Sequence, residues 1–269
     1  MITAIWLEND GNSSDLPLQD WQYNTASIDP LISGHKKPTS SHHLHSAMSQ
    51  DNQFQPPGGS ASRGPCPALN VLANHGYFPR DGKNLDRETI INGLTTVYNI
   101  DLGFAQFLAD RALELLGTKN DNGNVVLEDL EKLSTHNVIE HDISLSRLDL
   151  SLGDNNNPNA ELVEQVSQAS KDGFSMTFDD FAQLRRLRYD QCKNNPGLTW
   201  NLKQKITAYG ESALLLNVFG DGTTTKRSEL DTLFKEERLP ETFVKPEKPV
   251  TFSQVRWTAF KLLFKNRFK

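Results

Sequence analysis

The chain has 269 residues, enough for one substantial hydrophobic core, and its 36% hydrophobic and 23% charged residues are ordinary for a globular protein. A formal net charge of −6 excludes a global field that would attract nucleic acid or an anionic membrane. Two cysteines exclude a disulfide-dense scaffold but leave a single bridge, a metal ligand or free thiols. The chain shows no secretion signal and no apolar stretch that spans a bilayer, so we expect an intracellular protein or a mature secreted form.

The first part of the chain is predicted to be an irregular N-terminal arm over residues 1–55. Residues 9–62 are rich in Ser, Pro, Gly, Asn and His and show no sustained hydrophobic period. The cluster Ser41-His42-His43-Leu44-His45 offers imidazole ligands to a divalent metal, but histidines in a polar arm are more often simply solvated.

From Pro67 onwards, apolar residues recur at three-and-four spacing, which predicts amphipathic helices. Capping residues mark several starts, with Asn157 as the cap and Pro158 as the first residue of one helix, and Thr-x-x-Asp at Thr177 opening the next. Alternating strand-like runs are nearly absent. The predicted helices cover 68–76, 86–99, 102–116, 158–170, 177–193 and 199–219. We therefore predict an all-α fold with one multi-helix domain over 56–239.

The first candidate site is Cys66, in the run Arg63-Gly64-Pro65-Cys66-Pro67-Ala68-Leu69-Asn70. Pro67 pre-organises the first turn of the following helix, so the sulfur is expected at a helix N-terminus. The helix dipole and the free N–H groups there stabilise a thiolate, which suits a metal ligand or a nucleophile. The alternative is a buried structural cysteine, because a free cysteine packs like a small hydrophobe.

The second candidate is the run Glu140-His141-Asp142-Ile143-Ser144. Glu140 and Ser144 are four residues apart and are predicted on one face of a helical turn, where an oxygen pair suits a hard cation such as Mg²⁺. His141 would point elsewhere and meet another element. The alternative is a polar helix start capped by Asp142, and the residues alone favour that alternative.

The third candidate is Glu211, the only charged residue between Lys205 and Asp221, on a helix that is apolar nearly all round. Burial is expected to raise the pKa of its carboxyl group, giving a side chain that takes and returns a proton near neutral pH. The alternative is a structural ion pair with an arginine. The candidate partners are Arg185, Arg186 and Arg188.

The C-terminal extension, residues 240–269, is basic and amphipathic. Between Lys245 and Lys269 it has seven Lys or Arg against one Glu, with aromatic and aliphatic residues interspersed. A basic amphipathic helix can lie on a membrane surface. More often such a helix packs on its own domain, and we expect packing here.

Together and in this order, the three motifs resemble the fungal haem-thiolate peroxidases, the family of chloroperoxidase and the unspecific peroxygenases. The likeness extends through residues 70–80 and 153–155 and covers about residues 54–235. The Glu-His-Asp form of the middle motif makes the chain most similar to the short peroxygenases.

The resemblance implies a haem b with Cys66 as axial thiolate, and Glu211 as the distal acid–base with His141 as its orienting partner. The absence of Cys-x-x-Cys-His agrees with a haem that is not covalently attached. Residues beside the thiolate are expected to contact the haem: Pro65, Pro67, Ala68, Leu69 and Asn70. The resemblance also implies Mg²⁺ near a haem propionate, with three ligands: the Glu140 carboxylate, the His141 backbone carbonyl and the Ser144 hydroxyl.

The implied activity is H₂O₂-dependent insertion of oxygen into small hydrophobic or aromatic molecules, by hydroxylation, epoxidation or aromatic oxidation, with one-electron peroxidase activity beside it. No nucleic-acid partner is expected, and the sequence does not predict the oligomeric state. One alternative is a halogenating peroxidase that uses the same Cys66 and Glu211. An alternative from another class is an all-α interaction protein in which Cys66 is structural and Glu211 is salt-bridged.

Overall fold

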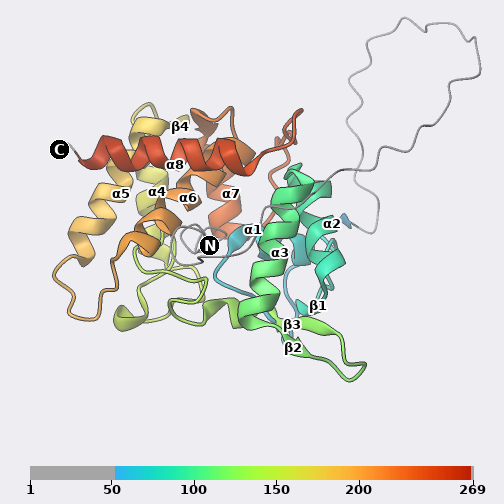
Figure 1. Cartoon of the computed structure of the whole chain (residues 1–269). Coiled ribbons are helices and arrows are strands. Elements are labelled where there is room, and N and C mark those ends of the chain that lie inside the picture. Colours follow the sequence, from blue (N-terminus) through green and yellow to red (C-terminus); the bar gives the residue numbers. More distant parts are fainter. Residues whose placement is uncertain (1–51, 268–269) are drawn as a thin grey trace, which may run out of the picture.

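A computed structural model describes residues 52–267 (Figure 1), so the predicted arm and its histidine cluster at 41–45 lie almost entirely outside the described residues. Within 52–267, no helix is long and apolar enough to cross a membrane. The helices are α1 (Pro67–Asn74), α2 (Arg87–Tyr98), α3 (Leu102–Leu116), α4 (Ala160–Gln168), α5 (Phe178–Cys192), α6 (Leu202–Val218), α7 (Arg227–Glu236) and α8 (Phe252–Arg267), with 3₁₀ helices at Leu130–Ser134 and Leu150–Leu152.

The predicted all-α fold is confirmed only in part: the described chain is mostly helical, but it also forms short strands. They are β1 (Lys83–Leu85), β2 (Thr118–Lys119), β3 (Val125–Asp129), β4 (Ser175–Thr177) and β5 (Thr224–Lys226). The first three form an antiparallel sheet in the order β1-β3-β2, with Leu85 opposite Leu127, and β4 pairs with β5. Strands of two to five residues are too short to show an alternating pattern. The fold is therefore mostly helical with a small sheet.

Side-chain caps set the ends of the helices that follow the sheet. The predicted cap at α5 is confirmed: Thr177 accepts the N–H of Asp180, whose carboxylate in turn accepts the N–H of Thr177. The predicted start of α4 is two residues early. Asn157 donates its N–H to Asp154 in the preceding turn, and Asn159 caps the helix instead. The helix therefore begins after Pro158, not at it.

Helix α6 lies at the centre of the fold, which explains its lack of a polar face. Eleven of its 17 residues are buried. Helix α8 lies across the outer side of the molecule, over α6 and beside α5 (Figure 1). Its inner face buries Val255, Ala259 and Leu262 in the same core. The centre of α6 is thereby shielded on this side, while its other side faces a pocket.

Candidate functional site

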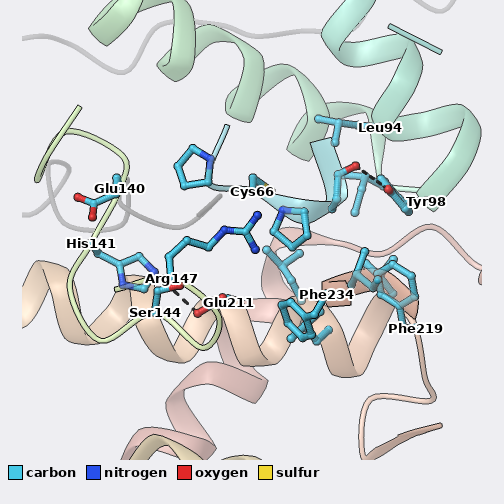
Figure 2. Close-up of a pocket in the computed structure, with 18 of the residues that line it drawn as sticks. Cys66, Leu94, Tyr98, Glu140, His141, Ser144, Arg147, Glu211, Phe219 and Phe234 are labelled. Atoms are coloured by element: carbon cyan, nitrogen blue, oxygen red, sulfur yellow. Dashed lines mark hydrogen bonds and ion pairs between the residues drawn. The ribbon is translucent and has the colours of Figure 1, made fainter. Parts of the chain in front are cut away.

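A pocket lies between α1, α2, α6, α7 and the loop after Ser134 (Figure 2). Its polar side chains gather at one end, and aromatic side chains lie at the other, with Cys66 between them. The polar lining consists of Glu140, His141, Ser144, Arg147, Asn155 and Glu211, and the apolar lining includes Leu94, Tyr98, Leu214, Leu215, Val218, Phe219, Leu233 and Phe234.

Cys66 lies at the N-cap of α1, where its thiol is free, buried and without a capping hydrogen bond. The loop before it is held by Asn70, which accepts the Gly64 N–H at 2.9 Å and donates to the Gly64 carbonyl at 2.7 Å. A Cβ at Gly64 would lie 2.4 Å from the Leu130 carbonyl oxygen, so only glycine fits there. The tight loop and its clamp fix the sulfur at the wall of the pocket.

Of the residues beside Cys66 that were predicted to contact the haem, only some line the pocket. Pro65, Pro67 and Ala68 line the pocket with Cys66. Leu69 lines a separate apolar cavity, and the Asn70 side chain is used by the Gly64 clamp, so neither lines this pocket. Successive helical residues turn by about 100°, which carries both side chains away from the pocket.

The segment with Glu140 and Ser144 is a loop, and both the predicted helical turn and the helix start capped by Asp142 are wrong. Ile143 has φ +60°, a left-handed conformation that a β-branched residue rarely adopts. Its N–H donates to Asp149 at 2.7 Å, and its carbonyl accepts from Arg185 at 2.7 Å. This turn still brings Glu140 and Ser144 to the same end of the pocket.

A histidine that the sequence analysis missed contacts this loop. His136 Nδ1 lies 2.8 Å from Glu140 Oε2, which also accepts the N–H of Asn137 at 3.2 Å. His136, Glu140 and Asp142 each offer a ligand atom, all within 4.8 Å of one another. Asp142 Oδ1 is buried without a hydrogen-bond partner. The loop thus gathers more donor atoms than the predicted Mg²⁺ set, although Mg²⁺ prefers oxygen over imidazole nitrogen.

Glu211 projects from α6 into the pocket and forms an ion pair with Arg185, one of the three arginines named as candidates. Arg185 is 1% exposed and also donates to Ser212 Oγ at 2.8 Å. Burial acts to raise the pKa of Glu211, but the guanidinium of Arg185, aided by His141, outweighs it and lowers the pKa to about 2. The prediction of a raised pKa is therefore wrong, because the charge partner dominates.

His141 faces the same carboxylate. Its Nε2 lies 4.0 Å from Glu211 Oε2, and its Nδ1 lies 2.8 Å from the Asp142 carbonyl oxygen. A carbonyl only accepts, so Nδ1 carries the proton of the neutral ring and Nε2 is left as an acceptor. Burial first, and then Arg185, lower the His141 pKa to about 4, which keeps the ring neutral near pH 7. Glu211 and His141 thus present two proton acceptors side by side.

Arg147 also lines the pocket, although nothing in the sequence singled it out. It is 1% exposed, and it donates to Glu237 Oε1 at 2.5 Å and to Ser146 Oγ at 2.7 Å. Its partner Glu237 comes from the end of α7, ninety residues away in the sequence. Only the three-dimensional contact distinguishes Arg147 from a solvated arginine.

Cys192, the other cysteine, is buried at the end of α5 and does not line the pocket. Burial raises the pKa of its thiol to about 11. Both cysteines are free, so the single bridge left open by the sequence is excluded. Of the two sulfurs, only Cys66 has access to the pocket.

The fold and pocket define a mostly helical protein with a buried thiol, Cys66, and an ion-paired carboxylate, Glu211, on one cavity. Residues 52–248 match the family described as peroxidase, family 2. The chain is 31% identical over 217 residues to an aromatic peroxygenase from Coprinellus radians, covering 72% of this chain and 82% of that protein. It is 30% identical over 215 residues to an aromatic peroxygenase from Cyclocybe aegerita, covering 70% of this chain and 56% of that protein.

A third relative is a chloroperoxidase from Leptoxyphium fumago, 35% identical over 152 residues, covering 51% of this chain and 39% of that protein. The chain belongs to peroxidase family 2, the haem-thiolate peroxidases. It is accordingly an oxidoreductase that acts on H₂O₂, and the family implies a haem iron.

The residues of the pocket fit such a group. Cys66 offers a soft sulfur ligand whose side chain is not used as a helix cap. Apolar and aromatic side chains form the walls, as a flat hydrophobic macrocycle requires, while Arg147 and the Glu140 loop supply polar groups at one end. The donor set is therefore that of a site for an amphipathic, iron-containing cofactor.

Proposed function

We propose that this chain is a peroxygenase that uses H₂O₂ to insert oxygen into small apolar or aromatic molecules. The observation that carries the proposal is the position of Cys66 and Glu211, which reach the same apolar pocket from α1 and α6. The relatives named aromatic peroxygenase support the same class of substrate. The catalytic unit is then residues 56–239, with 240–269 packed on it.

The haem would be held by the Cys66 sulfur, with Pro65, Pro67 and Ala68 packed beside the ligand. A thiolate-ligated haem supplies an iron whose electron density is increased by the sulfur, which favours cleavage of the O–O bond. The Asn70 clamp on Gly64 keeps the cysteine loop in place. The remaining chemistry is proton transfer, and it belongs to the residues of α6 and the Glu140 loop.

Glu211 moves the proton. Its carboxylate would take the proton from one oxygen of H₂O₂ and give it to the other oxygen, which would leave as water. Because Arg185 lowers its pKa, Glu211 is a weaker base for the first transfer and a stronger acid for the second than an ordinary glutamate. His141 Nε2, 4.0 Å away, offers a second acceptor that orients the peroxide for the first transfer. Arg185 holds the Glu211 carboxylate in position while it is deprotonated.

The Mg²⁺ site is proposed at the Glu140 loop, with the Glu140 carboxylate, the His141 carbonyl and the Ser144 hydroxyl as ligands. Glu140 and Ser144 line one end of the pocket, where the haem carboxylates would need a counter-charge. His136 and Asn137 both contact Oε2 of Glu140, which fixes the carboxylate and leaves Oε1 for the cation.

The substrate would bind at the aromatic end of the pocket. Tyr98 donates its hydroxyl to the Ala68 carbonyl at 2.7 Å, so its phenol group is satisfied and its ring serves as an apolar wall. Phe219 packs against Tyr98 at 5.9 Å between ring centroids, and Phe234 completes this end. Rings of this kind favour flat aromatic or aliphatic substrates over charged ones.

Two measurements on the haem-loaded protein test the proposal. The reduced CO complex should show the red-shifted Soret band of a thiolate-ligated haem. An aromatic substrate treated with isotopically labelled H₂O₂ should then gain the labelled oxygen. Unlabelled product would contradict oxygen insertion, and turnover that depends on added bromide would favour the halogenating alternative. A protein that stays colourless after haem supplementation would favour a non-catalytic role.

A further inference from the structure

The outer face of α8 carries an exposed ridge of three aromatic side chains: Trp257, Phe260 and Phe264, which are 61%, 47% and 37% exposed. Their spacing of three and four residues places them on one face of the helix. Trp257 stacks on Phe260 with centroids 5.8 Å apart, and Phe260 contacts Phe264 at 4.4 Å. Exposed aromatic clusters of this kind mark interaction surfaces.

This aromatic ridge is not needed for the packing of α8. The opposite face of the helix supplies Val255, Ala259 and Leu262, which are buried against the core around α6. Figure 1 shows α8 running along the outside of the molecule. Among residues 52–267, the helix is therefore apolar on two opposite sides: one packs on the core, and the other leaves its aromatic side chains partly exposed.

Cations flank the aromatic ridge. Helix α8 has four Lys or Arg and no acidic residue, in a chain whose formal net charge is −6. At 100° per residue, Arg256 lies on one side of the ridge and Lys261 on the other, and both are exposed. Lys265 is less available, because it pairs with Asp179. The outer face of α8 thus carries cationic and aromatic side chains, although the chain as a whole has a negative formal net charge.

A groove lined by similar aromatic and cationic side chains lies beside the aromatic ridge. Leu263 and Phe264 of α8 line it together with side chains of α5, α6 and the segment between them, around a volume of about 380 Å³. The other lining residues are Arg186, Tyr189, Trp200, Leu202, Lys205 and Tyr209. Tyr189 and Trp200 pack at 5.9 Å, and Leu202 is 55% exposed. Trp, Tyr and cationic side chains together are typical of surfaces at the level of lipid headgroups.

The size and charge of the ridge argue against a second copy of the chain as its partner. The three aromatic side chains expose about 300 Å² between them, whereas a stable dimer buries about 800 Å² on each partner. A two-fold contact through α8 would also place cations against cations. A convex ridge can insert its rings among lipid chains.

We propose that the outer face of α8 binds the surface of an anionic lipid bilayer. Trp257, Phe260 and Phe264 enter the boundary between headgroups and acyl chains, with the helix lying parallel to the membrane. Arg256 and Lys261 contact acidic headgroups on either side of the ridge. Binding is peripheral and reversible, and the pocket remains on the far side of α6 from the bilayer.

Vesicle sedimentation of the full haem-loaded chain tests this surface. Phosphatidylcholine vesicles with and without phosphatidylserine are compared for the wild type and three variants: W257Q/F260Q/F264Q, R256Q/K261Q and, as a control, Leu102→Gln. Leu102 is 57% exposed on α3, outside the α8 surface. Each cation near an anionic surface contributes about fivefold, so R256Q/K261Q should lose about 25-fold in binding to the mixed vesicles only.

The aromatic triple variant should lose at least tenfold in binding to the mixed vesicles, and Leu102→Gln should bind like the wild type. Peroxidase activity in solution should stay unchanged in all three, which shows that they fold. Wild-type tryptophan fluorescence should shift to the blue on the mixed vesicles, with a smaller shift in Trp257→Phe. Failure of the wild type to sediment, or equal binding of the triple variant, would overturn the proposal. So would a wild-type dimer that the triple variant converts to a monomer, because a second copy would then cover the ridge.

Discussion

Replacing Glu211 by Gln separates its role in proton transfer from its role as the partner of Arg185. Glutamine keeps nearly the same volume and can accept the Arg185 hydrogen bond, but it cannot carry the proton. A positioned acid–base contributes about 10²–10⁴-fold, so kcat/KM for H₂O₂ should fall by that factor. Substrate affinity should change little, because the aromatic end of the pocket is untouched.

Glu211→Gln should also lower the free energy of unfolding, because it removes the ion pair with Arg185. Arg185 is 1% exposed, and in Glu211→Gln its buried charge keeps only neutral acceptors, Ser212 and the Ile143 carbonyl among them. Loss of a charged hydrogen bond costs about 2 kcal/mol, or about 4–8 °C in Tm for a domain of this size. The variant should therefore be folded and able to hold haem, but less stable than the wild type.

A matched control separates the two effects. Glu229 of α7 is also buried and ion-paired, with Lys226 at 2.9 Å, and it lies outside the pocket. Glu229→Gln should lose stability without losing peroxide turnover. The measurements are thermal unfolding followed by haem absorbance, and rapid mixing of the haem-loaded variants with H₂O₂. If Glu211→Gln consumes peroxide as fast as the wild type, Glu211 is a structural partner of Arg185 and the proton takes another route.

Four further changes test the rest of the site. In the wild type the Glu211 pKa is about 2, because Arg185 outweighs burial. In Arg185→Gln burial dominates and raises that pKa, so the acid limb of the pH–rate profile should move to higher pH. Cys66→Ser should lose the red-shifted Soret band of the reduced CO complex, because a hydroxyl is a poor ligand for this role. Glu140→Gln should lower the Mg²⁺ content in elemental analysis and speed haem loss, and an unchanged metal content would refute that ligand. Thr177→Ala removes the α5 cap and should cost about 1 kcal/mol in urea unfolding, with the spectrum unchanged.

The helices were predictable because their signals are local. The bounds of α3 agree with the prediction at both ends, and the Thr177 capping box at α5 was visible as Thr-x-x-Asp. The strands were not predictable, because β2 and β3 have only two and five residues and owe their existence to pairing with each other and with β1. The Asn157 cap failed for a similar reason: the Asn157 side chain donates to Asp154 in the preceding turn.

The candidate site was predictable as a set of residues but not as an electrostatic system. The sequence showed that Glu211 lies in an apolar helix and that arginines on the preceding helix were available. It could not show which arginine points inward. Arg185, Arg186 and Arg188 are close in sequence, yet Arg186 pairs with Asp190 on the surface while Arg185 reaches Glu211. One helical step of about 100° thus decides whether the pKa of Glu211 rises or falls.

Arg185 also explains why the Glu140 loop can adopt a strained turn. The positive φ of Ile143 costs free energy, and such a conformation persists only where its surroundings hold it. The same guanidinium that lowers the pKa of Glu211 accounts for one of the two hydrogen bonds that hold Ile143. The position of the loop and the protonation of Glu211 are therefore coupled through one side chain. A change at Arg185 should therefore alter both the cation site proposed at Glu140 and the acid–base group at Glu211.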